Sequence, residues 1–196
     1  MAYRVDVAIP DFWTDIHLDA NSAVDISLDI TEHLLPLVDE ESIEQTQQYV
    51  ERSLVEAKDQ GIIRLSEMFL PAESQPISAY AIVQIMPALA VSDSADELGA
   101  IFETLTNMLT HSVTQSDTSI VRLDDGTKAV RLYGIQNIVI NNQGDMNPAF
   151  VMHTFLPHED TIIHLLCLTF NTDLMDDFGE AFEAISNTLH VRGTER

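Results

Sequence analysis

Two histidines, His153 and His164, stand in the apolar stretches where we expect the last β-hairpin. If the loop of that hairpin is His158-Glu159, His153 lies directly opposite His164, with their Cβ atoms about 5 Å apart. Two imidazoles at that separation, beside an acidic neighbour, could hold zinc. No third ligand stands at a fixed offset, and a one-residue change of register would put the rings on opposite faces. We therefore expect no metal and no cofactor, and a paired role on the sheet for both histidines.

The other residues that could do chemistry favour structural roles. Cys167 lies in an apolar run without a basic neighbour, so we predict a buried, inert thiol. Acidic residues at the start of the last helix suit the helix dipole and a solvated face, and they lack the spacing of a calcium loop; they are Asp173, Asp176, Asp177, Glu180 and Glu183. The sequence has no glycine-rich phosphate loop, no Gly-x-Ser-x-Gly and no His-Glu-x-x-His. It therefore predicts no catalytic residue.

The net charge of −23 excludes nucleic acid and anionic membranes as expected partners. Residues 1–98 contain 19 acidic and 4 basic side chains, a net of −15, whereas residues 99–196 contain 13 and 5, a net of −8. Three explanations stand: a solvated acidic surface, a face that meets a basic partner, and adaptation to a salty cytoplasm. The sequence shows no signal peptide and no apolar run near the ~18 residues of a membrane span, so we expect a soluble cytoplasmic protein.

Hydrophobic periodicity predicts one α+β domain over residues 1–196 with a mainly antiparallel sheet. The expected strands are 3–9, 12–18, 62–70, 77–86, 120–123, 129–140, 149–156 and 161–170. The expected helices are 22–35, where a strand pattern competes, then 40–60 with Gly61 as its stop, 93–111, and 171–189 with Asn171 at its cap. We read 112–119 as a polar linker, Asp125-Gly126 as a type I′ turn and Gly134 as the site of a bulge.

The N-terminal segment carries the one feature that suggests an interface. Trp13, the only tryptophan, follows a Pro-Asp turn and the apolar Phe12. Trp13 either anchors the first strand to the core or lines a cleft or interface, where tryptophan is enriched. The acidic residues that follow would supply an electrostatic part of such an interface; they are Asp15, Asp19, Asp25 and Asp29.

Both ends of the chain resemble a family of uncharacterised actinobacterial proteins with a PsbP-like fold, which Ran-binding Mog-type proteins share. The stretch Val-Ala-Ile-Pro-Asp-Phe-Trp at 7–13 is similar to their V-P-D-x-W opening. The apolar strand at 161–170, followed by a helix with Phe182, Ile185 and Thr188-Leu189, is similar to their ending. The resemblance implies an antiparallel sheet of about six or seven strands with helices on both faces, an α/β/α sandwich. Proteins of this fold mostly bind other proteins, and no catalytic residue carries over.

These observations leave two hypotheses of function. The first is a non-catalytic binding or accessory protein, chaperone-like in one version, that engages a probable protein partner, basic if charge drives the contact. Phe12 and Trp13 would then be the apolar anchor. The second is an enzyme or small-molecule binder whose pocket gathers His17, His153 and His164. The sequence does not identify the partner or the oligomeric state.

Overall fold

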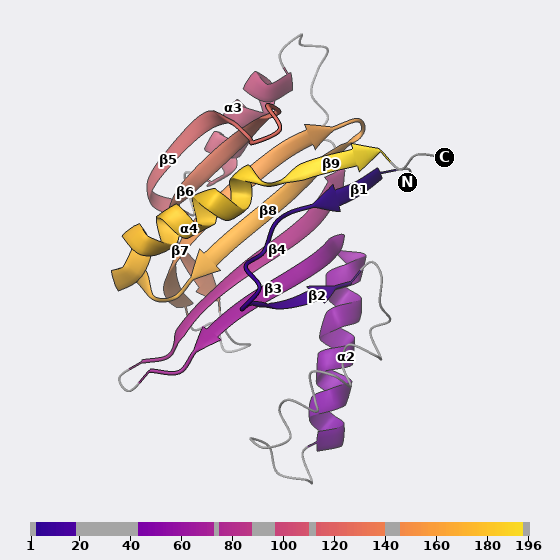
Figure 1. Cartoon of the computed structure of the whole chain (residues 1–196), viewed down its shortest axis with the longest axis vertical. Helices are drawn as coiled ribbons and strands as arrows, with labels where there is room; N and C mark the ends of the chain where they lie inside the picture. Colours follow the sequence, from indigo (N-terminus) through magenta and orange to yellow (C-terminus); the bar gives the residue numbers. More distant parts are fainter. Residues whose placement is uncertain are drawn as a thin grey trace.

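The computed structural model describes residues 3–18, 43–72, 75–87, 97–109, 113–139 and 146–193. Within these ranges a seven-stranded antiparallel sheet has the order β2-β3-β4-β8-β7-β6-β5 (Figure 1). Its strands are β2 (Thr14–His17), β3 (Ile62–Leu70), β4 (Ile77–Pro87), β5 (Val113–Arg122), β6 (Lys128–Val139), β7 (Met146–His158) and β8 (Thr161–Thr169). A separate ribbon pairs β1 (Tyr3–Asp6) with β9 (His190–Gly193). The prediction of an α+β protein with a mainly antiparallel sheet is confirmed.

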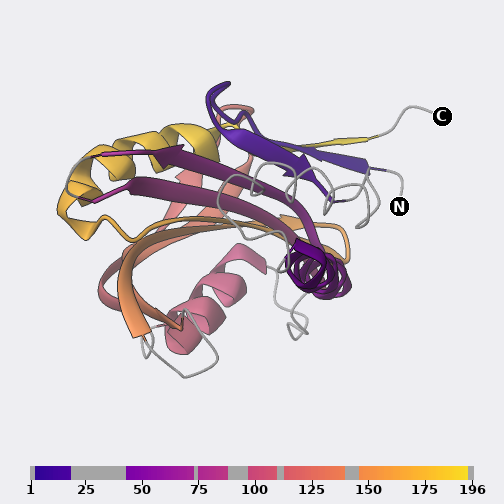
Figure 2. The ribbon, with the colours of Figure 1, turned by 90° about the horizontal axis from the view of Figure 1, so that it is seen from below.

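Helix α4 (Met175–Asn187) and the β1–β9 ribbon lie on one side of the sheet, and α3 (Glu97–Leu109) lies on the other (Figure 2). A short 3₁₀ turn, η3 (Thr172–Leu174), leads into α4. The main core cluster holds the buried stripe of α4, Phe178, Phe182 and Ile185. A second cluster holds Ile101 of α3 with Val130, Phe155 and Ile162 of the sheet. Because successive strand residues point to opposite faces, β7 and β8 supply both clusters.

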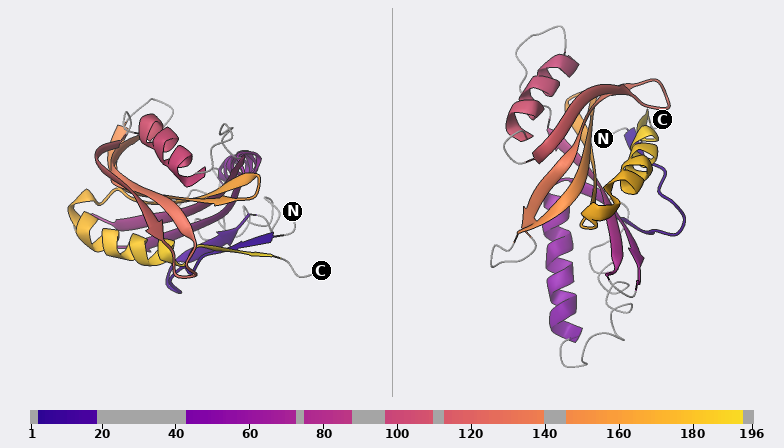
Figure 3. Two further views of the ribbon diagram at one scale, coloured as in Figure 1. Left: turned by 90° about the horizontal axis from the view of Figure 1, so that it is seen from above. Right: turned by 90° about the vertical axis from the view of Figure 1, so that its left-hand side faces the viewer.

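Helix α2 (Ile43–Asp59) packs near the β2–β3 edge through a small cluster of its own and extends away from the sheet (Figure 3). As predicted, Gly61 ends this helical segment in the left-handed region, with φ +82°. Its carbonyl accepts a hydrogen bond from the Ile85 amide at 2.8 Å, which ties the turn to β4. None of the helices formed by the described residues combines the length and apolarity needed to cross a membrane. The helix predicted over residues 22–35 lies outside the described ranges.

A buried arginine on β6 holds the C-terminal turn of α4 against the sheet. Arg131 is only 3% exposed. Its Nη2 donates to Ser186 Oγ and Asn187 Oδ1, both at 2.7 Å, and its Nη1 donates to Glu183 Oε1 at 3.1 Å. Burial lowers the pKa of this guanidinium, and Glu183 offsets part of that shift. Since arginine stays charged in proteins, these acceptors compensate for part of its lost hydration, while its buried Nε has no partner among the described residues.

Three predictions for strands and their edges were wrong. The first strand ends at Asp6 and pairs with β9, a strand that we did not predict. Residues 113–119 of the predicted linker 112–119 are part of β5, because an edge strand needs only one partner and tolerates polar residues. The register of β5 and β6 shifts between Thr114 and Asp117, so the bulge lies in β5 opposite Gly134 rather than in β6.

Two predictions for local structure, a turn type and a helix cap, were also wrong. In the β5–β6 hairpin Gly126 has φ +88° but Asp125 does not have positive φ, which excludes a type I′ turn. The Gly126 amide instead bonds to the Leu123 carbonyl, and the Leu123 amide to the Thr127 carbonyl, the pattern of a type I turn with a left-handed third residue. Asn171 makes no cap hydrogen bond to the helix. Its side chain bonds to the Ser78 amide and the Pro76 carbonyl, and so it holds the start of β4.

Replacing the two left-handed glycines should separate backbone strain from crowding. A Cβ at Gly61 would lie 2.3 Å from the Ile85 carbonyl oxygen, whereas one at Gly126 would meet nothing within 4 Å. We expect Gly126→Ala to lower the free energy of unfolding by about 1 kcal/mol, the cost of the left-handed conformation alone. Gly61→Ala should cost at least about twice that, measured by urea denaturation. Equal losses would contradict the close approach of Gly61 and Ile85.

Removing the buried guanidinium should loosen α4. Arg131→Ala leaves a cavity and strips Ser186 and Asn187 of their shared donor, so we expect the free energy of unfolding to fall by about 2–4 kcal/mol. The matched control is Arg122→Ala, an exposed arginine that bonds only to the carbonyl of its own hairpin. That control should stay within about 0.5 kcal/mol of the wild type in the same denaturation experiment. A loss no larger than that of the control would show that Arg131 does not anchor the helix.

Candidate functional site

The two histidines of the last hairpin do come together, although not in the predicted register. The turn residues are Glu159 and Asp160, and His158 pairs with Thr161. His153 therefore lies opposite Leu166 and is diagonal to His164. The shift is two residues, so both rings stay on one face of the sheet. His153 Nδ1 lies 3.0 Å from His164 Nε2, and the Phe155 ring lies parallel to His164 at 4.5 Å between centroids.

A chain of hydrogen bonds fixes where the protons of this pair lie. Gln84 Nε2 donates to the Gln60 carbonyl at 2.9 Å, which turns Gln84 Oε1 toward His164 Nδ1 at 3.3 Å. That oxygen can only accept, so His164 carries its proton on Nδ1 and accepts through Nε2. His153 must then donate from Nδ1. Its Nε2 is left as a buried nitrogen that has no hydrogen-bond partner among the described residues.

Desolvation keeps both histidines neutral, although His153 is buried and His164 is half-buried. Burial lowers the pKa of His153 to about 4, and burial followed by the neighbouring ring lowers that of His164 to about 3. Within the described residues no group of three side chains could hold a metal ion. Neither ring lines the hollows described below, and His17 lies elsewhere, 3.3 Å from Asp15. Cys167 is buried as predicted, and burial raises its pKa to about 12, so its thiol is a poor nucleophile.

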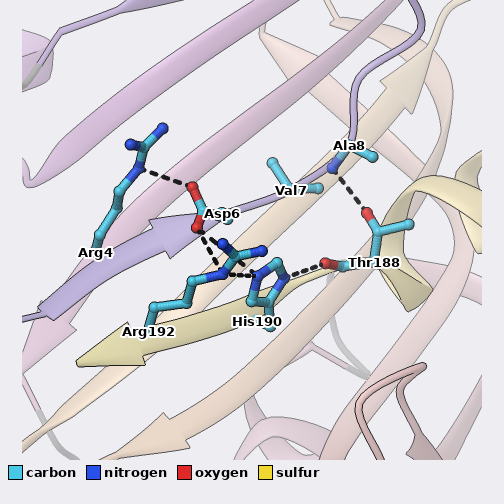
Figure 4. A pocket seen from close by; sticks show the side chains of 7 residues that line it. All are labelled: Arg4, Asp6, Val7, Ala8, Thr188, His190 and Arg192. Atoms are coloured by element: carbon cyan, nitrogen blue, oxygen red, sulfur yellow. Dashed lines mark hydrogen bonds and ion pairs between the residues drawn. The ribbon is translucent and has the colours of Figure 1, made fainter. Parts of the chain in front are cut away.

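The β1–β9 ribbon carries a cluster of charges around a hollow of about 340 Å³ (Figure 4). Arg4 and Arg192 lie directly opposite each other and share the carboxylate of Asp6, with Nε–O distances of 2.8 and 3.4 Å. His190 bonds to the Thr188 carbonyl through Nδ1 and accepts from Arg192 Nε at 2.8 Å. This shared carboxylate stabilises two like charges that would otherwise repel across the ribbon.

Phe12 and Trp13 lie at an apolar hollow of about 410 Å³, which we call the Phe12 hollow. Trp13 is 7% exposed and belongs to the main core, whereas Phe12 is 69% exposed. The tryptophan thus has both roles that the sequence left open, because it anchors the segment and also lines the hollow. The lining residues are Ala8, Ile9, Pro10, Phe12, Trp13, Met68, Phe178, Ala181, Ala184, Ile185 and Thr188.

The segment that carries Phe12 is held at both ends. The Ala8 amide donates to Thr188 Oγ1 at 2.8 Å, and Arg64 Nη1 donates to the Val7 carbonyl at 2.7 Å. The Trp13 amide bonds to the Pro10 carbonyl at 2.9 Å and closes the turn. Sequence reasoning missed Ala181 and Ala184, the small exposed residues through which α4 forms the opposite wall. Two alanines on the solvent side of an amphipathic helix were the signal for that wall.

Asp15 is engaged within the chain. Its carboxylate accepts from Arg64 Nε at 2.8 Å, Arg64 Nη2 at 2.5 Å and Ser66 Oγ at 2.7 Å. Burial by itself would raise the pKa of Asp15, but the bonds from Arg64 and Ser66 and the charge of Arg64 lower it overall. Asp15 therefore joins β2 to β3. The other three predicted acidic contacts, Asp19, Asp25 and Asp29, lie outside the described residues.

No protein-family model matches the sequence, and no curated protein is significantly similar to it. The shape and charge of the described surface are therefore the guide to function. The acidic side chains of the last helix are exposed, as the solvated-face prediction required; they are Asp173, Asp176, Asp177, Glu180 and Glu183. Asp173 lies in η3 and the other four lie on α4, the helix that forms one wall of the Phe12 hollow.

The histidine pair should make the fold sensitive to mild acid. The unfolded chain takes up protons below pH 6.5, whereas the folded pair resists protonation until about pH 4, so stability falls as the pH drops through that window. Each histidine costs up to about 1.4 kcal/mol per pH unit. We expect His153→Leu/His164→Leu to remove this loss, as measured by urea denaturation at pH 7, 6 and 5. An unchanged difference between pH 7 and 5 would contradict the buried neutral pair.

Proposed function

We propose that the protein is a non-catalytic binding or accessory module that docks a basic, amphipathic segment of a partner protein in the Phe12 hollow. The observation that carries this proposal is a phenylalanine 69% exposed at the rim of an apolar hollow. Exposing such a ring costs free energy that a partner would recover by covering it. The held ends of the Phe12 segment support a hollow that exists before the partner arrives.

Charge favours a basic partner over an acidic or neutral one. Two exposed carboxylates lie close to the lining residues: Asp11 precedes Phe12, and Asp177 lies one helical turn before Ala181. An apolar floor within an acidic rim matches a segment with apolar and basic faces, which negative potential would also steer. The same charge disfavours nucleic acid and anionic membranes.

We also propose that the fold is a PsbP-like sandwich and that the protein is cytoplasmic and bacterial. In the described residues α4 and α3 pack onto alternate sets of sheet side chains, which is consistent with helices on both faces of such a sandwich. Proteins of that fold mostly bind other proteins, which agrees with a docking role, although a fold by itself does not determine function.

The histidine-pocket enzyme receives less support. His153 and His164 meet, but neither lines one of the hollows described above, and His17 contacts Asp15 instead. A catalytic group must come within hydrogen-bond distance of its substrate. We therefore favour a structural role for the pair.

Trp13 offers a direct test, because it lines the Phe12 hollow and is the only tryptophan of the chain. A helical peptide of leucine and lysine should shift Trp13 fluorescence saturably, and the affinity should fall as salt is added. Phe12→Ser should weaken the binding about tenfold, the effect of removing an aromatic anchor.

The matched control is Phe69→Ser, since Phe69 is also exposed, at 59%, but does not line the hollow. This variant should bind the peptide as the wild type does. Equal weakening by both substitutions, equal binding of a leucine–glutamate peptide, or affinity independent of salt would each overturn the proposal.

A further inference from the structure

A second hollow lies beside α4, between this helix and strands β6 and β7. We call it the Tyr133 hollow; its volume is about 320 Å³. Its lining is Tyr133 and Phe150, Met152 and Met175, Gly179, and the carboxylates Asp176, Glu180 and Glu183. None of these residues lines the Phe12 hollow, so the two hollows share no residue.

The lining of the Tyr133 hollow suits an organic cation. Tyr133 is 37% exposed and Phe150 is 6% exposed, so one ring is accessible and the other lies deep in the wall. Aromatic faces attract guanidinium and ammonium groups, and the thioethers of Met152 and Met175 pack against apolar stems. Within the part of the chain that the structure describes, no three acidic, histidine or cysteine side chains are placed to hold a metal ion, so an organic cation suits this lining better.

The carboxylates leave negative charge for a ligand to neutralise. Glu183 already accepts from Arg131, but Asp176 and Glu180 are exposed. Asp117 adds to the field, because its Oδ2 accepts from the Tyr133 hydroxyl at 3.3 Å. Burial, Asp117 and then Glu183 raise the pKa of Tyr133, which is the response expected of a phenol among carboxylates.

Gly179 leaves open space in the α4 wall of the Tyr133 hollow. It stands in the interior of α4, where glycine is a poor helix former. No close approach requires glycine, since an added Cβ would meet only the Phe150 ring, at an ordinary 3.8 Å. An alanine would fit and would favour the helix, yet it would partly fill the hollow. The helix is therefore less stable with Gly179 than it would be with alanine, and the glycine leaves space open beside Phe150.

We propose that the Tyr133 hollow binds an arginine side chain, with its guanidinium between the Asp176 and Glu180 carboxylates and its stem on Tyr133 and Met175. This inference rests on the proposed function, since it assigns a basic residue of the docked partner to the second flank of α4. Arginine suits the site better than lysine, because a planar guanidinium stacks on aromatic rings and pairs with carboxylates as a fork.

The test uses Nα-acetyl-arginine amide as the probe and the methionine methyl NMR signals of the intact protein as the readout. The signals of Met152 and Met175 should shift saturably with this probe. Nα-acetyl-citrulline amide has nearly the same shape without the charge and should cause little shift. Equal shifts from citrulline amide, or tighter binding of Nα-acetyl-lysine amide, would overturn the assignment.

Variants then locate the binding. Glu180→Gln should weaken the arginine probe about two- to fivefold, as loss of an exposed ion pair would. Gly179→Ala should weaken it too, while its denaturation midpoint equals or exceeds that of the wild type, which excludes misfolding as the cause. The matched control is Asp173→Asn, an exposed carboxylate outside the hollow. Weakening by Asp173→Asn equal to that by Glu180→Gln, or wild-type binding by Gly179→Ala, would show diffuse surface attraction and no site.

Phe12→Ser distinguishes this inference from the proposed function. The variant should retain wild-type binding of the arginine probe while it loses the leucine–lysine peptide. Failure of the peptide test with intact arginine binding would overturn the docking role alone. Loss of arginine binding with an intact peptide test would overturn the Tyr133 hollow alone.

Discussion

A single buried charge determines where the last helix sits. A guanidinium that leaves water must find acceptors, and those of Arg131 all come from the C-terminal turn of α4. The apolar stripe of Phe178, Phe182 and Ile185 attracts the helix to the sheet but leaves its position along the sheet less defined. The directional bonds of Arg131 define that position. Both hollows depend on it, because α4 forms a wall of each.

The basic side chains of this acidic protein are largely used inside it. Arg64 joins β2, β3 and the segment before Phe12, Arg131 holds α4, and Arg4 and Arg192 share Asp6. Among the carboxylates of α4, Glu183 is paired with Arg131, whereas Asp176, Asp177 and Glu180 have no ion-pair partner among the described residues. These three exposed carboxylates therefore remain on the helix that forms a wall of both hollows.

How much could be predicted from the sequence depends on the range of each interaction. Alternation and turn residues predicted the hairpins well, and His153 and His164 were placed on one face because a two-residue error preserves the face. Gly61 was correctly read as a helix stop, since its role is local. The sequence did not predict β9, whose only partner, β1, lies at the other end of the chain. Likewise, no local sequence pattern indicated that Asn171 would bond to Pro76 and Ser78, or that Arg131 would bond to Ser186. Because such long-range contacts position α4, its place in the walls of both hollows was seen only in the structure.

The pairing of β1 with β9 determines when the Phe12 hollow can form during synthesis. Tyr3–Asp6 is synthesised long before its pairing partner, His190–Gly193. Until then the early strand has no edge to join, and neither Thr188 nor α4 exists to receive the segment around Phe12. The exposed ring and its hollow are therefore assembled only once synthesis has passed residue 193. A nascent or C-terminally truncated chain would carry Phe12 without the surface that surrounds it.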